Sequence, residues 1–290
     1  MRHAYLILAH TNWGQLQKLI ALLDDNRNDI YLHVDRKSRL DKHIKEGLVS
    51  SLRYSNLRFI EPITVNWGGY SIVRAEMQLL RTAIRYEYDY YHLLSGMDLP
   101  LKTQDEIDSF FEQNAGHEFL EYDTKGAWID RIGSRYQYYW LLNEHSRRNN
   151  NRLWKKINQL NIWIQRCLHI NRLKDHRMAA GPQWFSITHG FASEICANEK
   201  QVKKWFRNTF IPDESFVATM AEELGYKSGV FVVPSRSKLS PNLRLIDWNR
   251  GKPYVWRMEE YDDLMASECL FARKFDETVD NEIIVKIMRS

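Results

Sequence analysis

Cysteine is scarce in this sequence: three cysteines occur in 290 residues, at the widely separated positions Cys167, Cys196 and Cys269. An odd number of distant cysteines excludes a framework of paired disulfides, and their spacing does not match that of a structural zinc site. We therefore expect the chain to fold with reduced thiols, as proteins of the cytoplasm do.

Long apolar runs are also absent. No stretch approaches the ~20 apolar residues that a membrane-spanning helix needs, and the N-terminal "MRHAYLILAHTN" has only a short apolar segment before polar residues. We interpret that segment as a first strand and not as a signal peptide. With 44% hydrophobic and 27% charged residues, the composition is that of a soluble globular protein with a substantial core.

Short motifs that identify several common protein classes are missing. The first strand is not followed by GxGxxG, and the chain contains no GxxxxGK[ST], GxSxG or HExxH. These absences argue against a dinucleotide-binding protein, a P-loop nucleotidase, an α/β-hydrolase and a zinc protease.

Two apolar patterns alternate through the first part of the chain. Continuous apolar runs predict buried strands, and apolar residues three and four apart predict amphipathic helices. Strands are expected near 4–10, 29–34, 57–60, 90–95 and 117–122, and helices near 13–24, 73–84 and 104–114. This order predicts an α/β fold with a mostly parallel, Rossmann-type sheet, in which ligands bind beyond the carboxyl ends of the strands.

The remainder of the chain divides into two parts. Residues 125–180 are polar, basic and aromatic, with a helix expected near 150–168. Residues 181–290 return to strands near 183–188 and 242–248 and to helices near 190–207 and 212–224. We predict one domain in which a first half, 1–122, and a second half, 181–290, enclose a basic helical insertion.

Two carboxylates stand at the expected start of the 212–224 helix, in "PDESFVATMAEELG". Pro212 at the beginning and Gly225 beyond the end fit the usual asymmetry of helix termini. Asp213 and Glu214 have two interpretations: residues that cap the helix, or a catalytic base that the positive end of the helix keeps ionised.

The segments "HVDRKS", "HLLSGMDLPLKT", "PDESFVAT" and "LFARKFD" occur in an order and spacing that resemble the core-2/I-branching β-1,6-N-acetylglucosaminyltransferase family, which also contains peptide O-xylosyltransferases. The chain is similar to a compact bacterial member, and the likeness is weakest through the basic insertion. The resemblance implies a GT-A-like fold and inverting transfer of a sugar, N-acetylglucosamine by family default. The donor would be a UDP-sugar and the acceptor a glycan hydroxyl in the synthesis of cell-surface polysaccharide.

The resemblance also implies the site residues. Glu214 matches the catalytic base that takes the proton of the acceptor hydroxyl, which leaves Asp213 as the cap. Glu121 and Trp184 match the acceptor site, although Trp184 is equally expected as a core residue. The residues expected to bind the donor are Leu8, Ala9, His10, Asp35, Arg36 and Lys37, with Arg244 and Lys274 on its diphosphate.

The expected chemistry uses no metal or other cofactor. Many GT-A enzymes hold a divalent metal through an Asp-x-Asp motif, which this chain lacks. In the branching enzymes an arginine and a lysine neutralise the diphosphate instead, as Arg244 and Lys274 would here. The alternative is a Mn²⁺ site at Glu121 and Asp123, which stand two apart at a strand end.

Other function classes remain as alternatives. A non-catalytic module that binds a sugar or nucleotide would keep the same fold. Nucleic-acid binding ranks last, because a net charge of +4 is modest and no helix-turn-helix or RNP pattern is present.

The basic segment 146–177 carries nine lysines and arginines against one acid, Asp175. Apolar residues lie in it at helical spacing, at Leu153, Trp154, Ile157, Leu160, Ile164 and Leu168. One hypothesis is a helix that packs onto the core and exposes a basic face. The other is an amphipathic helix on anionic lipid, which would bring a cytoplasmic enzyme to a lipid-linked acceptor at the inner face of the cell membrane.

Overall fold

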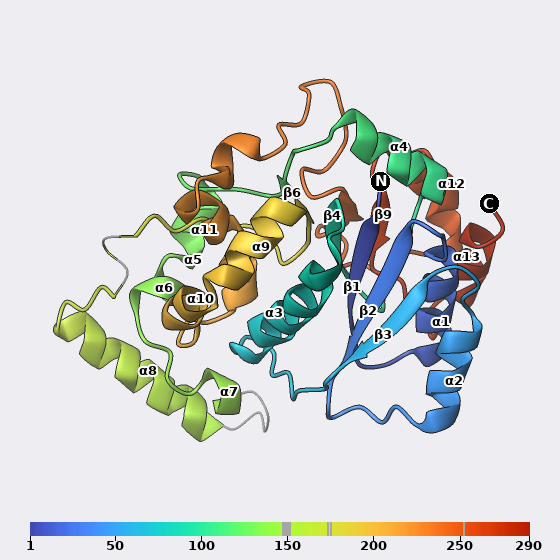
Figure 1. The fold of residues 1–290 in the computed structure, drawn as a ribbon. Coiled ribbons are helices and arrows are strands. Elements are labelled where there is room, and N and C mark those ends of the chain that lie inside the picture. The colour runs from blue at the N-terminus through green and yellow to red at the C-terminus, as the bar shows by residue number, and fades with distance from the viewer. Residues whose placement is uncertain (147–151, 173, 175, 252) are drawn as a thin grey trace.

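The computed structural model describes residues 1–290 except 147–151, 173, 175 and 252 (Figure 1). The strands are β1 (His3–Ala9), β2 (Asn28–Val34), β3 (Asn56–Ile60), β4 (Tyr90–Ser95), β5 (Asp98–Pro100), β6 (Phe119–Leu120), β7 (Phe185–Thr188), β8 (Arg244–Ile246) and β9 (Phe271–Arg273). The α-helices are α1 (Trp13–Leu22), α2 (Lys42–Ser50), α3 (Ser71–Ala83), α4 (Gln104–Gln113), α5 (Ala127–Ile132), α6 (Ser134–Gln137), α7 (Asn143–Ser146), α8 (Arg152–Cys167), α9 (His189–Ala197), α10 (Glu199–Phe206), α11 (Phe216–Glu223), α12 (Tyr261–Met265) and α13 (Asn281–Ile287).

The central sheet has the strand order β3-β2-β1-β4-β7-β6, with β1 to β4 parallel. Neighbouring side chains of β1 enter opposite cores: Leu6 packs with residues of α3 and α9, whereas Tyr5 and Ile7 pack with residues of α1 and α4. Helices therefore cover both faces (Figure 1), which explains why β1 is a nearly continuous apolar run. The predicted α/β fold with a mostly parallel sheet is confirmed.

Four local expectations are corrected. Strand β7 runs antiparallel to β4 and β6, and β6 contains two residues where six were expected. The helix expected over 190–207 is two helices, α9 and α10, which meet at Asn198. Asn12, which directly precedes α1 and is a residue type that favours helix capping, does not cap α1 with its side chain, which instead donates to Asp276 at 3.0 Å.

A second, small sheet joins the middle of the chain to its C-terminal motif. Strand β9 pairs with β5 and β8, and this pairing sets Asp98 opposite Arg273. The buried Asp98 carboxylate accepts bonds from the Ser95 N–H at 2.8 Å and the Ser95 hydroxyl at 2.9 Å. Asp98 therefore fixes the turn between β4 and β5.

The basic insertion forms helices α5 to α8, and α8 runs along the outer edge of the molecule (Figure 1). Among the described residues, no helix is both long enough and apolar enough to cross a membrane. The hypothesis that the apolar stripe of α8 packs onto the core is wrong for Leu160, Ile164 and Leu168, which are exposed. Arg147, Arg148 and Asp175 of the basic segment lie outside the described residues.

Candidate active site

A cavity of about 780 Å³ lies where β4 and β6 end and β7 begins. Glu121 follows β6 and Trp184 precedes β7, and the antiparallel pairing of Leu120 with Phe185 brings both to one edge of the sheet. The wall contains the tryptophans Trp67, Trp128, Trp184 and Trp248, the acids Glu121, Asp213 and Glu214, and the bases Arg131, Lys238, Arg244 and Arg273. Residues predicted from distant parts of the sequence therefore share one cavity.

Glu214 lies in a 3₁₀ turn, Pro212–Glu214, directly before α11. The predicted helix thus begins later, at Phe216, although Gly225 with φ 82° ends it as expected. The Glu214 carboxylate accepts a 2.6 Å ion-pair bond from Arg135 on α6. The basic insertion therefore supplies the cation that orients this carboxylate.

Asp213 is not the predicted helix cap, because its carboxylate accepts no bond from the first N–H groups of α11. Its Oδ1 is buried and has no hydrogen-bond partner within the described chain. Burial, and then the charge of Glu214, raise the pKa of Asp213 to about 7. The nearby Glu76 is buried too, accepts a 2.7 Å bond from Gln183, and has a raised pKa because of burial and of Asp213.

We expect Asp213→Asn to stabilise the protein in a pH-dependent way. A carboxyl whose pKa rises from 3.8 to about 7 on folding favours the folded state while protonated and costs stability once it ionises. The variant should therefore gain about 4 kcal/mol over the native chain at about pH 8 and less than about 1 kcal/mol at about pH 4. Denaturant unfolding across this range measures the difference, with Asp263→Asn on the exposed side of α12 as the control. A uniform loss of about 1 kcal/mol at both pH values would restore the capping role.

Gly181 allows two acid-bearing segments to approach each other. Its N–H donates to the Glu214 carbonyl at 3.0 Å, and a Cβ at this position would lie 2.2 Å from the Glu121 carbonyl oxygen. No larger residue fits without moving the backbone of Glu121. The distance between the predicted acceptor glutamate and the predicted base therefore depends on this glycine.

Glu121 and Asp123, the residues of the Mn²⁺ alternative, both accept hydrogen bonds from the protein. The Asp123 carboxylate accepts backbone N–H groups of Lys125, Gly126, Trp128 and Ile129, which fixes the start of α5. Glu121 accepts a 2.9 Å bond from Asn242, and burial raises its pKa. In the described part of the chain, no three histidine, cysteine, aspartate or glutamate side chains gather as metal ligands.

Arg244 lines the cavity but is almost fully buried. Its guanidinium donates to Ser186 Oγ at 2.8 Å and to the carbonyls of Leu93 and Phe185 at 3.2 and 2.7 Å. These bonds tie β8 to β4 and β7. Because most of its donors are already satisfied, Arg244 has a structural task, and its contact with a donor diphosphate stays a prediction.

The other predicted donor residues meet at the ends of β1, β2 and β9. Asp35 pairs with Lys37 at 3.3 Å, and its N–H donates to the Ala9 carbonyl at 3.0 Å. Burial lowers the pKa of His10. The carboxylate of Asp35 opposes that shift, and Lys274, Arg273 and Lys37 add to it. These charges therefore lie within electrostatic reach of His10.

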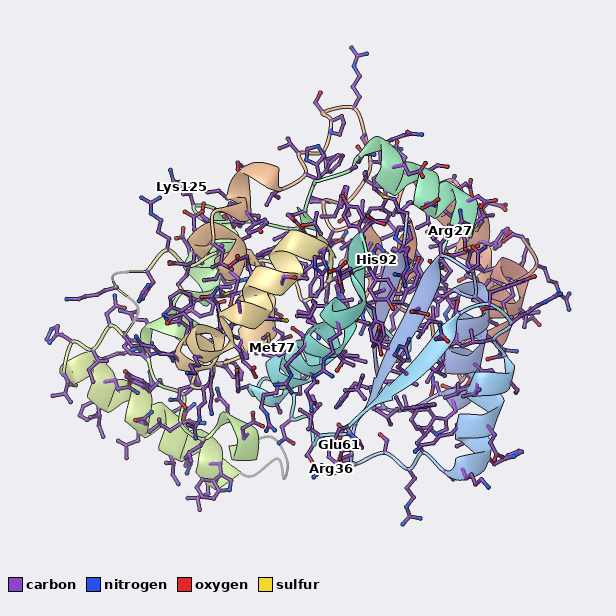
Figure 2. All side chains as sticks on the ribbon, viewed as in Figure 1. Arg27, Arg36, Glu61, Met77, His92 and Lys125 are labelled. Carbon is purple, nitrogen blue, oxygen red and sulfur yellow. The ribbon has the colours of Figure 1, made fainter. Side chains whose placement is uncertain are left out.

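Backbone bonds fix the remaining donor candidates. The Leu8 carbonyl accepts from the Gly96 N–H at 2.9 Å, which joins β1 to the turn that contains Asp98. Arg36 lies beside Glu61 at 3.6 Å and donates to the Pro62 carbonyl at 3.0 Å (Figure 2). Arg36 thus points toward β3 and away from the cavity wall, which does not contain it.

Sequence reasoning missed two arginines of the site. Arg273 lines the cavity, pairs with Asp98 at 2.6 Å and lies 4.5 Å from the ring centre of Trp184. Its neighbour Lys274 in "FARKFD" was the available signal. The sequence contained no signal for Arg135. This residue lies 79 positions from Glu214, and it belongs to the segment where the family resemblance is weak.

The cavity of this α/β fold lies beyond the carboxyl ends of strands of the sheet, which is where such folds generally bind ligands. A family model for the Core-2/I-Branching enzyme matches residues 3–267. The chain therefore belongs to the Core-2/I-Branching enzyme family, a class of glycosyltransferases.

Individual relatives agree with this assignment. Xylosyltransferase 2 of Homo sapiens is 24% identical over 98% of this chain, and Xylosyltransferase 1 of Mus musculus is 23% identical over 98%. The chain spans about a third of the length of these curated relatives. Among solved structures, the mouse Xyloside xylosyltransferase 1 apo form matches 93% of this chain and 97% of its own at 10% identity, with a TM-score of 0.43. A TM-score below 0.5 is too low to support a conclusion about this chain.

Proposed function

We propose that the protein is an inverting glycosyltransferase that moves a sugar from a UDP-sugar to a glycan hydroxyl in the synthesis of cell-surface polysaccharide. The observation that carries the proposal is one cavity that contains Glu214 and Arg273 and adjoins the donor cluster at His10, Asp35 and Lys274. N-acetylglucosamine is the donor sugar that the family name suggests. Xylose is the second candidate, because the two relatives described above are named xylosyltransferases.

The reaction assigns a task to each part of the cavity. The acceptor oxygen forms a bond to the anomeric carbon while its proton passes to the Glu214 carboxylate. The bond from that carbon to the UDP oxygen breaks, and its electron pair leaves with the diphosphate. The positive charges of Arg273 and Lys274 stabilise the departing group. Trp184, against which Arg273 packs, offers an aromatic face to a sugar ring.

A donor screen tests the proposal and separates it from a non-catalytic binding module. Thermal unfolding is measured with UDP-N-acetylglucosamine, UDP-xylose, UDP-glucose and GDP-mannose, because a ligand that binds only the folded chain raises its Tm. The donor that gives the largest shift is then incubated with the protein, and release of UDP is followed. Binding without any release of UDP, alone or with glycan acceptors, would support the binding module instead.

Catalysis is expected without a divalent metal. The reason is that Arg273 and Lys274 supply positive charge near the donor cluster, whereas Asp123 is occupied by backbone N–H groups. Transfer rates in excess EDTA should therefore stay within about twofold of the rates with Mn²⁺, because side-chain cations already neutralise the departing diphosphate. Activity that disappears in EDTA and returns only with Mn²⁺ would contradict this expectation.

The proposed setting is the cytoplasm, where UDP-sugars are available to an enzyme with reduced thiols. A glycan acceptor carried on a lipid would be presented there at the inner face of the cell membrane.

A further inference from the structure

Helix α8 turns its apolar side outward. Leu160, Trp163 and Ile164 are exposed, Trp163 by 62%, and so is Leu168 directly after the helix. These residues are three and four positions apart, so they form one continuous stripe. A surface helix of a globular protein ordinarily buries such a stripe.

The inward side of α8 is held by amide groups. Gln165 is buried, and its side chain accepts from the Tyr139 N–H at 2.8 Å and donates to the Tyr139 carbonyl at 3.0 Å. Asn161 donates to the same carbonyl at 2.7 Å. A rotation that buried Leu160 or Trp163 would break these bonds, so the outward direction of the stripe is built into the packing.

Helix α10 provides a contrast within the same molecule. It buries Val202 and Trp205 and exposes Lys203 and Lys204, which is the ordinary arrangement. Helix α8 exposes basic residues as well, but it exposes the apolar stripe together with them. The exposed lysines of α10 therefore serve as a matched control for charge without an apolar face.

The charge around the stripe has one sign. No aspartate or glutamate occurs between Arg152 and Cys167, while Lys156 and Arg166 are exposed on one flank of the stripe. A two-fold contact between copies of this chain would set these cations against each other. The stripe and its charge fit a partner that is apolar inside and negatively charged at its surface.

We propose that α8 docks on an anionic membrane surface. Leu160, Trp163, Ile164 and Leu168 enter the boundary between headgroups and acyl chains, and Lys156 and Arg166 contact lipid phosphates. Tryptophan favours this boundary, and each surface cation adds about 1 kcal/mol of attraction to anionic lipid.

The docked helix is connected to the cavity through a short path. Tyr139, which bonds α8, follows α6, and α6 carries the Arg135 that pairs with Glu214. The biological purpose of this docking rests on the proposed function: a glycosyltransferase bound to the membrane would meet an acceptor that is carried on a lipid. The docking itself requires no sugar and is tested without one.

The test is co-sedimentation of the full chain with vesicles. One set contains phosphatidylglycerol and phosphatidylcholine, the other phosphatidylcholine alone, each at low and high salt. We expect binding to the anionic set that weakens in high salt. Lys156→Glu with Arg166→Glu should reduce the partition coefficient at least about 30-fold, because two cations worth about 1 kcal/mol each are lost and two anions are added. Leu160→Ser with Trp163→Ser should reduce it at least about 10-fold, because apolar area no longer enters the boundary.

Lys203→Glu with Lys204→Glu on α10 is the matched control and should leave binding within about twofold, since it changes the same charge without an apolar stripe. Thermal unfolding of each variant checks that it is folded. No binding to anionic vesicles at low salt would overturn the docking proposal. Equal losses of vesicle binding in the α8 and α10 charge variants would overturn it too. A protein that binds no vesicles and forms a dimer that Trp163→Ser dissociates would also contradict it.

Release of UDP from the donor in solution, measured without vesicles, is the separate readout of the proposed function. The α8 variants should keep it, because their substitutions lie outside the cavity. A chain that docks but releases no UDP would contradict the enzyme and leave the docking surface in place. A chain that releases UDP but never docks would contradict the docking surface alone.

Discussion

Glu214→Gln is expected to abolish sugar transfer while the affinity for the donor stays within a few-fold of the native value. Glutamine has nearly the same shape as glutamate but cannot accept the proton of an attacking hydroxyl. Loss of a general base commonly lowers the rate by about 10² to 10⁴. Because Arg135 contacts the carboxylate at 2.6 Å, the side chain already has a fixed position in the cavity.

The measurement combines the transfer rate with titration of UDP or the intact donor. Glu194→Gln, the same chemical change on the exposed side of α9 and outside the cavity wall, is the control and should behave as the native chain. Turnover of Glu214→Gln near the native rate would remove Glu214 from the role of base. Asp213 and Glu121 would then be the carboxylates of the same cavity to examine.

Lys274→Ala is expected to weaken binding of UDP by about 10-fold to 100-fold. In the described part of the chain no carboxylate lies within ion-pair distance of Lys274, whereas its neighbour Arg273 is paired with Asp98. The charge of Lys274 is therefore less offset by a neighbouring carboxylate than that of Arg273, and Lys274 should contribute more to binding the diphosphate. A hydrogen bond to a charged group contributes about 1.5 to 3 kcal/mol, which corresponds to that range of affinity.

Isothermal titration with UDP and with uridine locates the effect. The loss should appear with UDP and be small with uridine, because only UDP carries the diphosphate. Lys200→Ala, an exposed lysine of α10, controls for the general change in charge. Equal affinity of Lys274→Ala and the native chain for UDP would show that another group, such as Arg244, neutralises the diphosphate.

The sequence by itself determined the elements whose signals are local. The run "AYLILAH" predicts β1 because a strand covered on both faces must be apolar at every position. The spacing of Val73, Met77 and Leu80 predicts α3 because residues three and four apart share one face of a helix. The sequence motifs also identified the family, since "SGMDLPLKT" and "PDESF" are specific to it.

Local signals did not determine how strands β6 and β7 pair. The short apolar segments 117–122 and 183–188 contain no information on direction, which depends on the partner strand. The same limit applies to the 190–207 helix, where a periodic pattern continues across the break at Asn198. Periodicity reports which residues share a face and does not report where backbone hydrogen bonds are interrupted.

Only the tertiary structure decided the electrostatics of the site. Asp213 resembles a helix cap in the sequence, but the burial of its carboxyl and the charge of Glu214 raise its pKa to about 7. Arg244 resembles a free cation, but strands β4 and β7 surround it with carbonyl acceptors. Burial and long-range charge come from residues far apart in the chain, so a linear pattern cannot contain them.

The direction of α8 was likewise left open by the sequence. Its apolar stripe predicts an amphipathic helix, and a stripe of this kind fits both a core and a membrane. The choice depended on Gln165 and Asn161, whose amide groups bind the backbone of Tyr139 and fix the helix with the stripe outward. A pattern of hydrophobicity defines a face, but only the contacts on the opposite face decide whether that stripe meets protein or solvent.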